Sequence, residues 1–151
     1  LDTTRTFGAF SVGVTAGTAI PTGGNAIFTG KVAGSYVPAT PGDGYAVLAN
    51  LTVNVDFSSQ SLAFKTTDTL TSLDWTTFAP KDSLNLSGNL SYSPGTNGFT
   101  GDLSTVSGLT GQSSGQFYGP TAQELGGVFF LQGNGGETYT GAYGAKVITA
   151  P

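Results

Sequence analysis

Alternation of apolar and polar side chains is the feature that most constrains the fold of this chain. Between residues 46 and 57, apolar side chains recur at every second position: Val47, Ala49, Leu51, Val53, Val55 and Phe57. The positions between them are mostly polar, with Ala46 and Leu48 as the apolar members. A period of two places successive side chains on opposite faces of a β-strand, so that one face is buried and the other meets water. The sequence therefore predicts a β protein.

The same period recurs along the rest of the chain. Within Ser83–Tyr92 the apolar positions are Leu84, Leu86, Leu90 and Tyr92, and similar stripes run from Phe28 to Tyr36 and from Tyr139 to Val147. Shorter candidate strands are Thr6–Val14, Ser61–Thr67, Leu70–Thr77, Phe99–Val106 and Leu125–Gln132. Segments rich in Pro, Gly and Asn, such as Pro38–Gly44, Pro94–Gly98 and Gly133–Gly136, predict turns between strands.

Eight or nine short strands without an amphipathic helix are typical of a barrel or a sandwich. Glycines inside the strands favour the barrel, because tightly coiled sheets need residues without a Cβ atom. We therefore expect an all-β chain: a single eight-stranded antiparallel β-barrel over residues 21–151 and an arm of residues 1–20 that carries an additional N-terminal strand. The capping-box spacing of Thr121–Glu124 predicts at most one short helical turn there.

Composition narrows the class of protein. The 151 residues suit one domain, and the net charge of −4 with five scattered basic residues argues against a nucleic-acid partner. The chain has no run of 18 apolar residues, so it is not expected to span a membrane by a helix. It begins at Leu1 without a signal segment, which suggests a mature form or a piece of a longer protein.

The residue types that most catalytic sites need are absent. The chain has no His and no Cys, so Gly111–Gly115, which fits the Gly-x-Ser-x-Gly pattern, lacks a base and is interpreted as a loop. The acidic residues Asp43, Asp56, Asp68, Asp74, Asp82 and Asp102 are spread among turns and strand ends, where they are expected to cap turns. No metal site, no cofactor and no enzymatic activity are expected. Tyrosines could ligate haem as phenolates, but core packing is the favoured role of all six.

The single tryptophan is the candidate partner contact. Trp75 stands in the segment Leu73–Phe78, and exposed tryptophans are frequent at protein–protein contacts. The alternative is that Trp75 caps one end of the core. Tyr45 and Phe78 are the other residues expected at such a contact.

One stretch of the chain carries a family resemblance. Gly115–Val128 reads GQFYGPTAQELGGV, and it closely resembles the signature of the β-barrel domain of transferrin-binding protein B-like surface lipoproteins and related secreted haem-binding proteins. Further pieces similar to the family follow its order: Asn25–Gly34, Leu51–Phe57, Phe99–Gly101 and Gly141–Lys146. The signature residues here, expected to build the barrel, are Gly115, Phe117, Tyr118, Gly119, Pro120, Glu124, Gly126 and Gly127.

The resemblance implies an eight-stranded barrel that is secreted and is displayed on, or released from, the outer surface of a Gram-negative bacterium. Display would tether the chain to the outer membrane through a missing N-terminal segment. It implies no catalysis, and it places partner contacts in the loops. We therefore expect a non-catalytic binding module that contacts a ligand or a partner protein through its barrel loops. The alternative is a self-assembling structural subunit of an extracellular fibre or surface layer, joined through the N-terminal strand.

Overall fold

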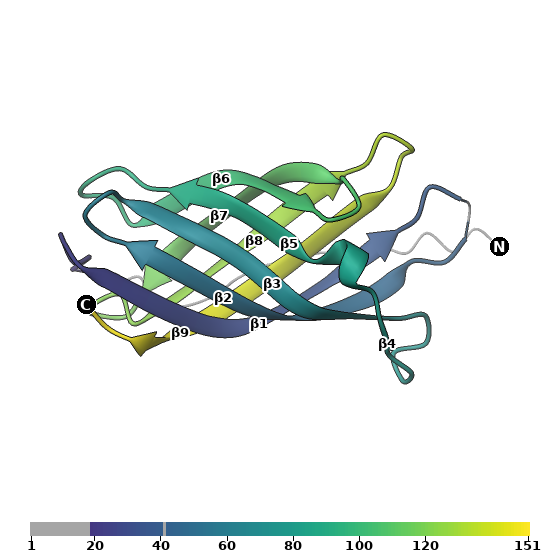
Figure 1. Cartoon of the computed structure of the whole chain (residues 1–151), viewed down its shortest axis with the longest axis horizontal. Coiled ribbons are helices and arrows are strands. Elements are labelled where there is room, and N and C mark those ends of the chain that lie inside the picture. Colours follow the sequence, from purple (N-terminus) through teal and green to yellow (C-terminus); the bar gives the residue numbers. More distant parts are fainter. Residues whose placement is uncertain (1–18, 41) are drawn as a thin grey trace.

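The computed structural model describes residues 19–40 and 42–151. These residues form nine strands and one short 3-10 helix, and contain no long helix (Figure 1). The elements are β1 (Asn25–Val37), β2 (Tyr45–Asp56), β3 (Ser61–Ser72), β4 (Ala79–Pro80), η1 (Asp82–Leu84), β5 (Leu86–Ser91), β6 (Gly98–Thr105), β7 (Thr110–Tyr118), β8 (Glu124–Gln132) and β9 (Thr138–Thr149). The expected all-β fold is confirmed.

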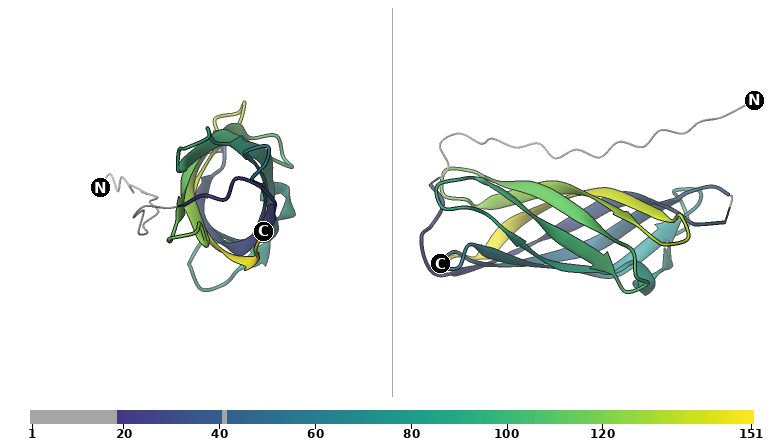
Figure 2. Two further views of the ribbon diagram at one scale, coloured as in Figure 1. Left: turned by 90° about the vertical axis from the view of Figure 1, so that its left-hand side faces the viewer. Right: turned by 90° about the horizontal axis from the view of Figure 1, so that it is seen from above.

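Eight of the strands close into an antiparallel barrel. The hydrogen-bonded order is β2-β1-β9-β8-β7-β6-β5-β3, and the pairing of β2 with β3 closes the circle. The two-residue strand β4 pairs with β3 outside this circle. The strands coil around a common axis, and the cross-section of the barrel is oval (Figure 2). The predicted eight-stranded barrel is therefore the architecture of the chain.

The interior of the barrel is filled by the apolar stripes that the sequence shows. The alternate residues from Val47 to Phe57 are at most 4% exposed. Phe117 lies at the centre of an aromatic cluster, with ring centroids of neighbouring rings at 5.2 to 6.3 Å: those of Phe28, Phe57, Tyr92 and Phe99. Burial of one such side chain contributes about 1.5–3 kcal/mol. The signature residue Phe117 thus acts as part of the core.

Strand β7 corrects one expectation of the sequence. Gly111–Gly115 was expected as a loop, but these residues lie within β7 and pair with β6 and β8. Ser113 is 1% exposed, and its Oγ atom lies 2.7 Å from the Tyr143 hydroxyl inside the barrel. The serine is therefore part of a buried hydrogen-bonded pair. The absence of a side chain at Gly115 leaves room for the Phe99 ring, because an added Cβ atom would overlap it.

Strand β3 corrects a second expectation. Ser61–Thr67 and Leu70–Thr77 were expected as two strands, but a single strand runs to Ser72 and contains a β-bulge opposite Leu48 and Asn50. Asp68 lies at the bulge with a φ angle of 52°. Beyond Lys65 the strand no longer pairs with β5, and the Thr66 hydroxyl accepts a hydrogen bond from the Leu86 amide in place of the ladder.

The helical turn lies elsewhere than the capping-box spacing predicts. Gly119 and Ala122 have φ angles of 84° and 58°, which are incompatible with a right-handed helix. The segment forms a turn instead, in which the Thr121 backbone amide donates a hydrogen bond to Gln123 Oε1. The short helix is η1, at the beginning of the stretch Ser83–Tyr92 that was expected to be a strand throughout. The expected N-terminal strand Thr6–Val14 lies outside the described residues.

Candidate partner-binding surface

The three predicted contact residues lie at the same end of the barrel. Trp75 is 63% exposed in the loop between β3 and β4, and Phe78 is half-buried at the end of that loop. Tyr45 is the first residue of β2 and is also half-buried. We call this the Trp75 end; it comprises the connecting residues 38–40 and 42–44 together with the segments 73–78, 81–85, 106–109 and 133–137 (right-hand side of Figure 1).

A carboxylate holds the Trp75 loop in shape. Asp74 Oδ1 accepts hydrogen bonds from the backbone amides of Thr76 and Thr77, both at 2.8 Å, and from the Ser72 hydroxyl at 2.9 Å. The amide of Thr77, followed by that of Thr76, lowers the pKa of Asp74 well below its usual range. The carboxylate therefore remains ionised and keeps its donors at neutral pH. This confirms the expected turn-capping role for Asp74.

Trp75 itself has an unusual backbone conformation. Its φ angle of 65° lies in the left-handed region, which bulky residues rarely adopt. Such a conformation costs on the order of 1–3 kcal/mol, and it persists only where surrounding contacts enforce it. Here the Asp74 hydrogen bonds enforce it. The indole is thus exposed on a loop whose shape is already determined before any partner binds.

Tyr45 lines a small hollow at the mouth of the barrel. Its ring lies against that of Tyr36, with centroids 6.3 Å apart, and the hollow of about 150 Å³ is completed by Pro38, Thr71 and Lys81. Burial, and then the negative charge of Glu137, raise the pKa of Tyr36. The structure therefore places Tyr45 in the wall of the mouth and Trp75 on a separate loop beside it.

An apolar strip on the outer wall is a feature that sequence reasoning missed. Ala33, Leu48, Leu70 and Pro80 are direct cross-strand neighbours on β1, β2, β3 and β4, and Leu48 is 40% exposed. The corresponding row farther from the Trp75 end is polar: Thr29, Thr52, Lys65 and Ser87. Leu48, a large apolar residue on the mostly polar face of its strand, was the available signal. A groove of about 370 Å³ lies along the strip.

The charged groups beside the strip are paired through an amide. The Lys31 ammonium donates to Asn50 Oδ1, and Asn50 Nδ2 donates to Asp68 Oδ2 at 2.9 Å. One positive and one negative group thus share a hydrogen-bonded network on the outside of β1–β3. The strip therefore has no net charge at its border.

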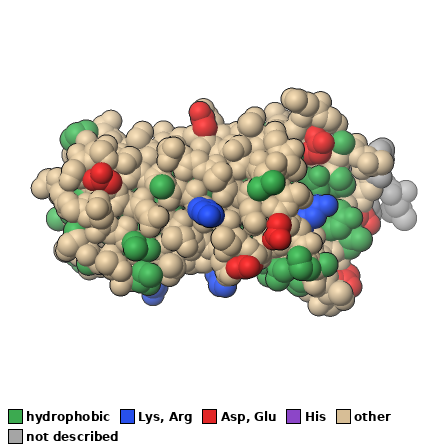
Figure 3. All heavy atoms as spheres, viewed as in Figure 1, with side chains coloured by type: hydrophobic (Ala, Val, Ile, Leu, Met, Phe, Trp, Pro, Cys, Tyr) green, Lys and Arg blue, Asp and Glu red, His purple; other side chains and the backbone are tan. Residues whose placement is uncertain are grey.

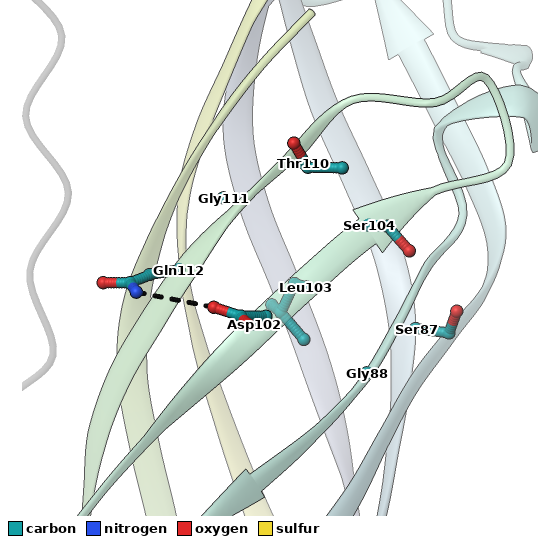
Figure 4. Close-up of a pocket in the computed structure, with 8 residues that line it drawn as sticks. All are labelled: Ser87, Gly88, Asp102, Leu103, Ser104, Thr110, Gly111 and Gln112. Atoms are coloured by element: carbon teal, nitrogen blue, oxygen red, sulfur yellow. Dashed lines mark hydrogen bonds between the residues drawn. The ribbon is translucent and has the colours of Figure 1, made fainter.

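A second groove, of about 430 Å³, lies over β5, β6 and β7 on the outside of the barrel (Figure 4). Asp102 is its one acidic side chain, and it accepts a long hydrogen bond of 3.4 Å from Gln112. The other lining residues are small or uncharged. A glycoside hydrolase would need two carboxyl groups facing one cleft, so this groove offers no site for that chemistry.

The tyrosines that could ligate haem lie mostly in the core. Tyr139 is fully buried, Tyr143 is 4% exposed, and burial raises the pKa of both phenols. Among the described residues, no three His, Cys, Asp or Glu side chains gather as a metal site. The described part of the chain also has no helix that is long and apolar enough to cross a membrane.

Fold and surface together define a class of protein: a closed antiparallel barrel with a filled interior, whose distinctive groups lie on the loops of one end and on the outer wall. The comparisons with known proteins give the family. The model of the C-lobe and N-lobe β-barrels of transferrin-binding protein B matches residues 20–147, and the chain belongs to this family. The recognition made from Gly115–Val128 is thereby confirmed.

Solved structures agree with this assignment. A mutant of transferrin-binding protein B from Haemophilus parasuis superposes with a TM-score of 0.62 at 25% identity, covering 85% of this chain and 27% of that one. The isotype 1 protein from serogroup B Neisseria meningitidis gives 0.58 at 21% identity, covering 89% and 28%. A protein described as a surface lipoprotein gives 0.56 at 15% identity, covering 91% and 65%.

The chain spans roughly a quarter of the length of the transferrin-binding proteins that it matches, since the covered shares are 27% and 28%. It corresponds to one barrel of those proteins. A search of the curated proteins finds no match to the sequence.

Proposed function

We propose that the chain is a non-catalytic binding module of a Gram-negative bacterium, displayed on the outer surface or secreted, and that it contacts a partner protein through the Trp75 end. The observation that carries the proposal is Trp75, 63% exposed on a loop held by Asp74. A large amphipathic side chain on a preformed loop loses little conformational entropy on binding. Family membership supports the same role.

The partner is proposed to be a protein, and transferrin is the first candidate to test. Proteins of the family are named for the binding of transferrin, and they contain β-barrels of this kind. The surface location is supported by the related surface lipoprotein. The self-assembly alternative depends on residues 1–18, which lie outside the described part of the chain.

The test compares two exposed apolar residues at opposite ends of the barrel. Binding of iron-loaded and iron-free transferrin to the immobilised chain is measured for the native sequence, Trp75→Ala and Ile148→Ala. Ile148 is 64% exposed, close to the 63% of Trp75, but lies near the end of β9. We expect Trp75→Ala to weaken binding at least about 10-fold, as for a central interface residue, and Ile148→Ala to leave it unchanged.

Two results would overturn parts of this proposal. Transferrin that fails to bind the native chain removes transferrin as the partner. Binding that survives Trp75→Ala removes the Trp75 end as the contact surface. A chain that assembles into ordered polymers and does not bind transferrin would favour the structural alternative instead.

A further inference from the structure

The Trp75 end has a net negative charge. Its connecting segments contain four acidic side chains and one basic side chain, which gives 1 − 4 = −3: Asp43, Asp74, Asp82 and Glu137 against Lys81. The hydrogen bonds to Asp74 keep that carboxyl ionised, so its charge is present at neutral pH. These acidic residues come from four different connecting segments, and they therefore surround the mouth of the barrel.

The connecting segments at the opposite end of the barrel are uncharged, and the strand ends beside them carry only Asp56 and the ion pair of Glu124 with Lys146. Its described segments, residues 19–24, 57–60, 92–97, 119–123 and 150–151, contain no Asp, Glu, Lys or Arg. The low overall charge of the chain, 9% of its residues, is thus distributed unevenly between the two ends. Acidic residues that served solubility alone would have no reason to fill the connecting segments of one end and to be absent from those of the other.

Exposed apolar side chains gather at the same negative end. Leu73 and Trp75 are 55% and 63% exposed, and Val37 and Val106 extend from the neighbouring segments. Hydrophobic side chains and acidic groups lie next to one another on the right-hand part of Figure 3. The outer strip of Leu48 and Leu70 continues towards this loop, and the charges beside it are already paired with each other.

From this juxtaposition we propose that the partner of the Trp75 end is a protein surface with an apolar centre surrounded by lysine or arginine side chains. The inference rests on the proposed function and specifies its partner. An apolar centre buries Trp75 and Leu73, and a basic rim meets Asp43, Asp82 and Glu137. Complementary potentials accelerate encounter and exclude partners of like charge, each such clash costing several kcal/mol. A partner with an acidic rim is rejected.

The experiment selects binders without assuming the identity of the partner. A phage-displayed library of disulfide-cyclised random peptides is panned against the full chain. The enriched peptides are synthesised, and their affinities are measured for the native chain and for four variants. The variants are Trp75→Ala, Ile148→Ala, a mouth variant (Asp43→Asn, Asp82→Asn, Glu137→Gln) and a control variant (Asp56→Asn, Asp102→Asn, Glu124→Gln). The two triple variants remove the same number of charges, and thermal melts verify that all variants fold.

The expected result is a set of cationic peptides with a central aromatic or aliphatic residue. Their affinity falls at least about 10-fold for the mouth variant and less than about 2-fold for the control variant, and it weakens with added salt, because exposed charges are screened beyond about 8 Å at physiological ionic strength. Trp75→Ala weakens binding, and Ile148→Ala does not.

Each contrary result has a separate meaning. Peptides that are neutral or acidic, or that bind the mouth variant as well as the native chain, overturn the basic rim while leaving Trp75 as the contact. Peptides that bind Trp75→Ala as well as the native chain overturn the Trp75 end, and with it the proposed function. A selection that returns no binder to the native chain has the same consequence.

Discussion

At the scale of the residue, one carboxylate determines how the only tryptophan of the chain is presented. Asp74 is exposed, yet its Oδ1 atom accepts three hydrogen bonds from the loop that follows it and from Ser72. Its folded-state pKa lies below the unfolded value of about 3.9. The stabilisation that it supplies is therefore fully present above about pH 4 to 5 and is lost as the pH falls through the folded-state pKa.

The hydrogen bonds of Asp74 predict how the fluorescence of Trp75 changes with pH. Tryptophan emission reports on this residue alone, because the chain has a single Trp. Anisotropy and emission maximum are expected to stay constant from about pH 8 to about pH 5 and to change only in stronger acid. Asp74→Ala lowers the anisotropy over the whole range, since the loop amides lose their acceptor. Asp82→Ala removes an equal charge nearby and serves as the control. Equal anisotropy in Asp74→Ala and the native chain would contradict the role given to Asp74.

At the scale of the element, glycines decide where neighbouring strands approach closely. A Cβ atom added to Gly30 on β1 would overlap the Gly144 carbonyl oxygen and lie 2.6 Å from the Ala145 Cα atom of β9. A Cβ atom added to Gly144, the cross-strand neighbour of Lys31, would meet nothing within 4 Å. The two positions are one residue apart in register and differ only in the side of the sheet that they face.

The pair Gly30→Ala and Gly144→Ala tests this difference. Gly30→Ala forces backbone atoms of β1 and β9 apart, and is expected to lower the free energy of unfolding by at least about 1–3 kcal/mol. Gly144→Ala is expected to change it by less than about 1 kcal/mol, because the added methyl group points to open space. Urea denaturation followed by circular dichroism gives both values. Equal losses would show that strand propensity, and not close approach at Gly30, governs both positions.

The elements also show what the sequence can and cannot predict. The interior stripes were predictable because a two-residue period is a local property. Phe117 was predictable as a barrel-building residue because it belongs to the family signature Gly115–Val128. The bulge at Asp68 was not, since a non-glycine residue with a φ angle of 52° is enforced by pairing with β2. The same holds for Ala122, whose left-handed conformation replaces the expected helical turn. In both places tertiary contacts overrode a local pattern.

The candidate surface was predictable only where a local pattern indicates it. Asp74, expected among turns and strand ends, was a local signal for a turn cap. Leu70–Thr77 was nevertheless expected to be a strand, and the sequence left open whether Trp75 is exposed or caps the core. The outer strip brings together Ala33, Leu48 and Pro80, which are far apart along the chain and become neighbours only through the register of four strands. No local pattern contains that register. The charge difference between the two ends likewise appears only once the topology assigns each connecting segment to an end.

At the scale of the whole molecule, closure of the sheet determines how the chain can associate with copies of itself. Within residues 19–40 and 42–151, each of the eight barrel strands pairs on both sides. The strand left at the edge is β4, which is two residues long and includes Pro80, a residue without an amide hydrogen. A short edge strand with proline is a poor template for pairing with another sheet.

A chain truncated to residues 19–151 is therefore expected to fold with one cooperative thermal transition and to remain monomeric at millimolar concentration, as measured by sedimentation equilibrium. The reason is that the barrel satisfies its own backbone hydrogen bonds and fills its own interior. Polymers formed by the full chain and absent from the truncated one would assign assembly to residues 1–18. Polymers formed by the truncated chain would contradict this prediction, because association would then use the outer wall or the loops of the barrel. The apolar strip and the Trp75 end would be the first surfaces to test by substitution.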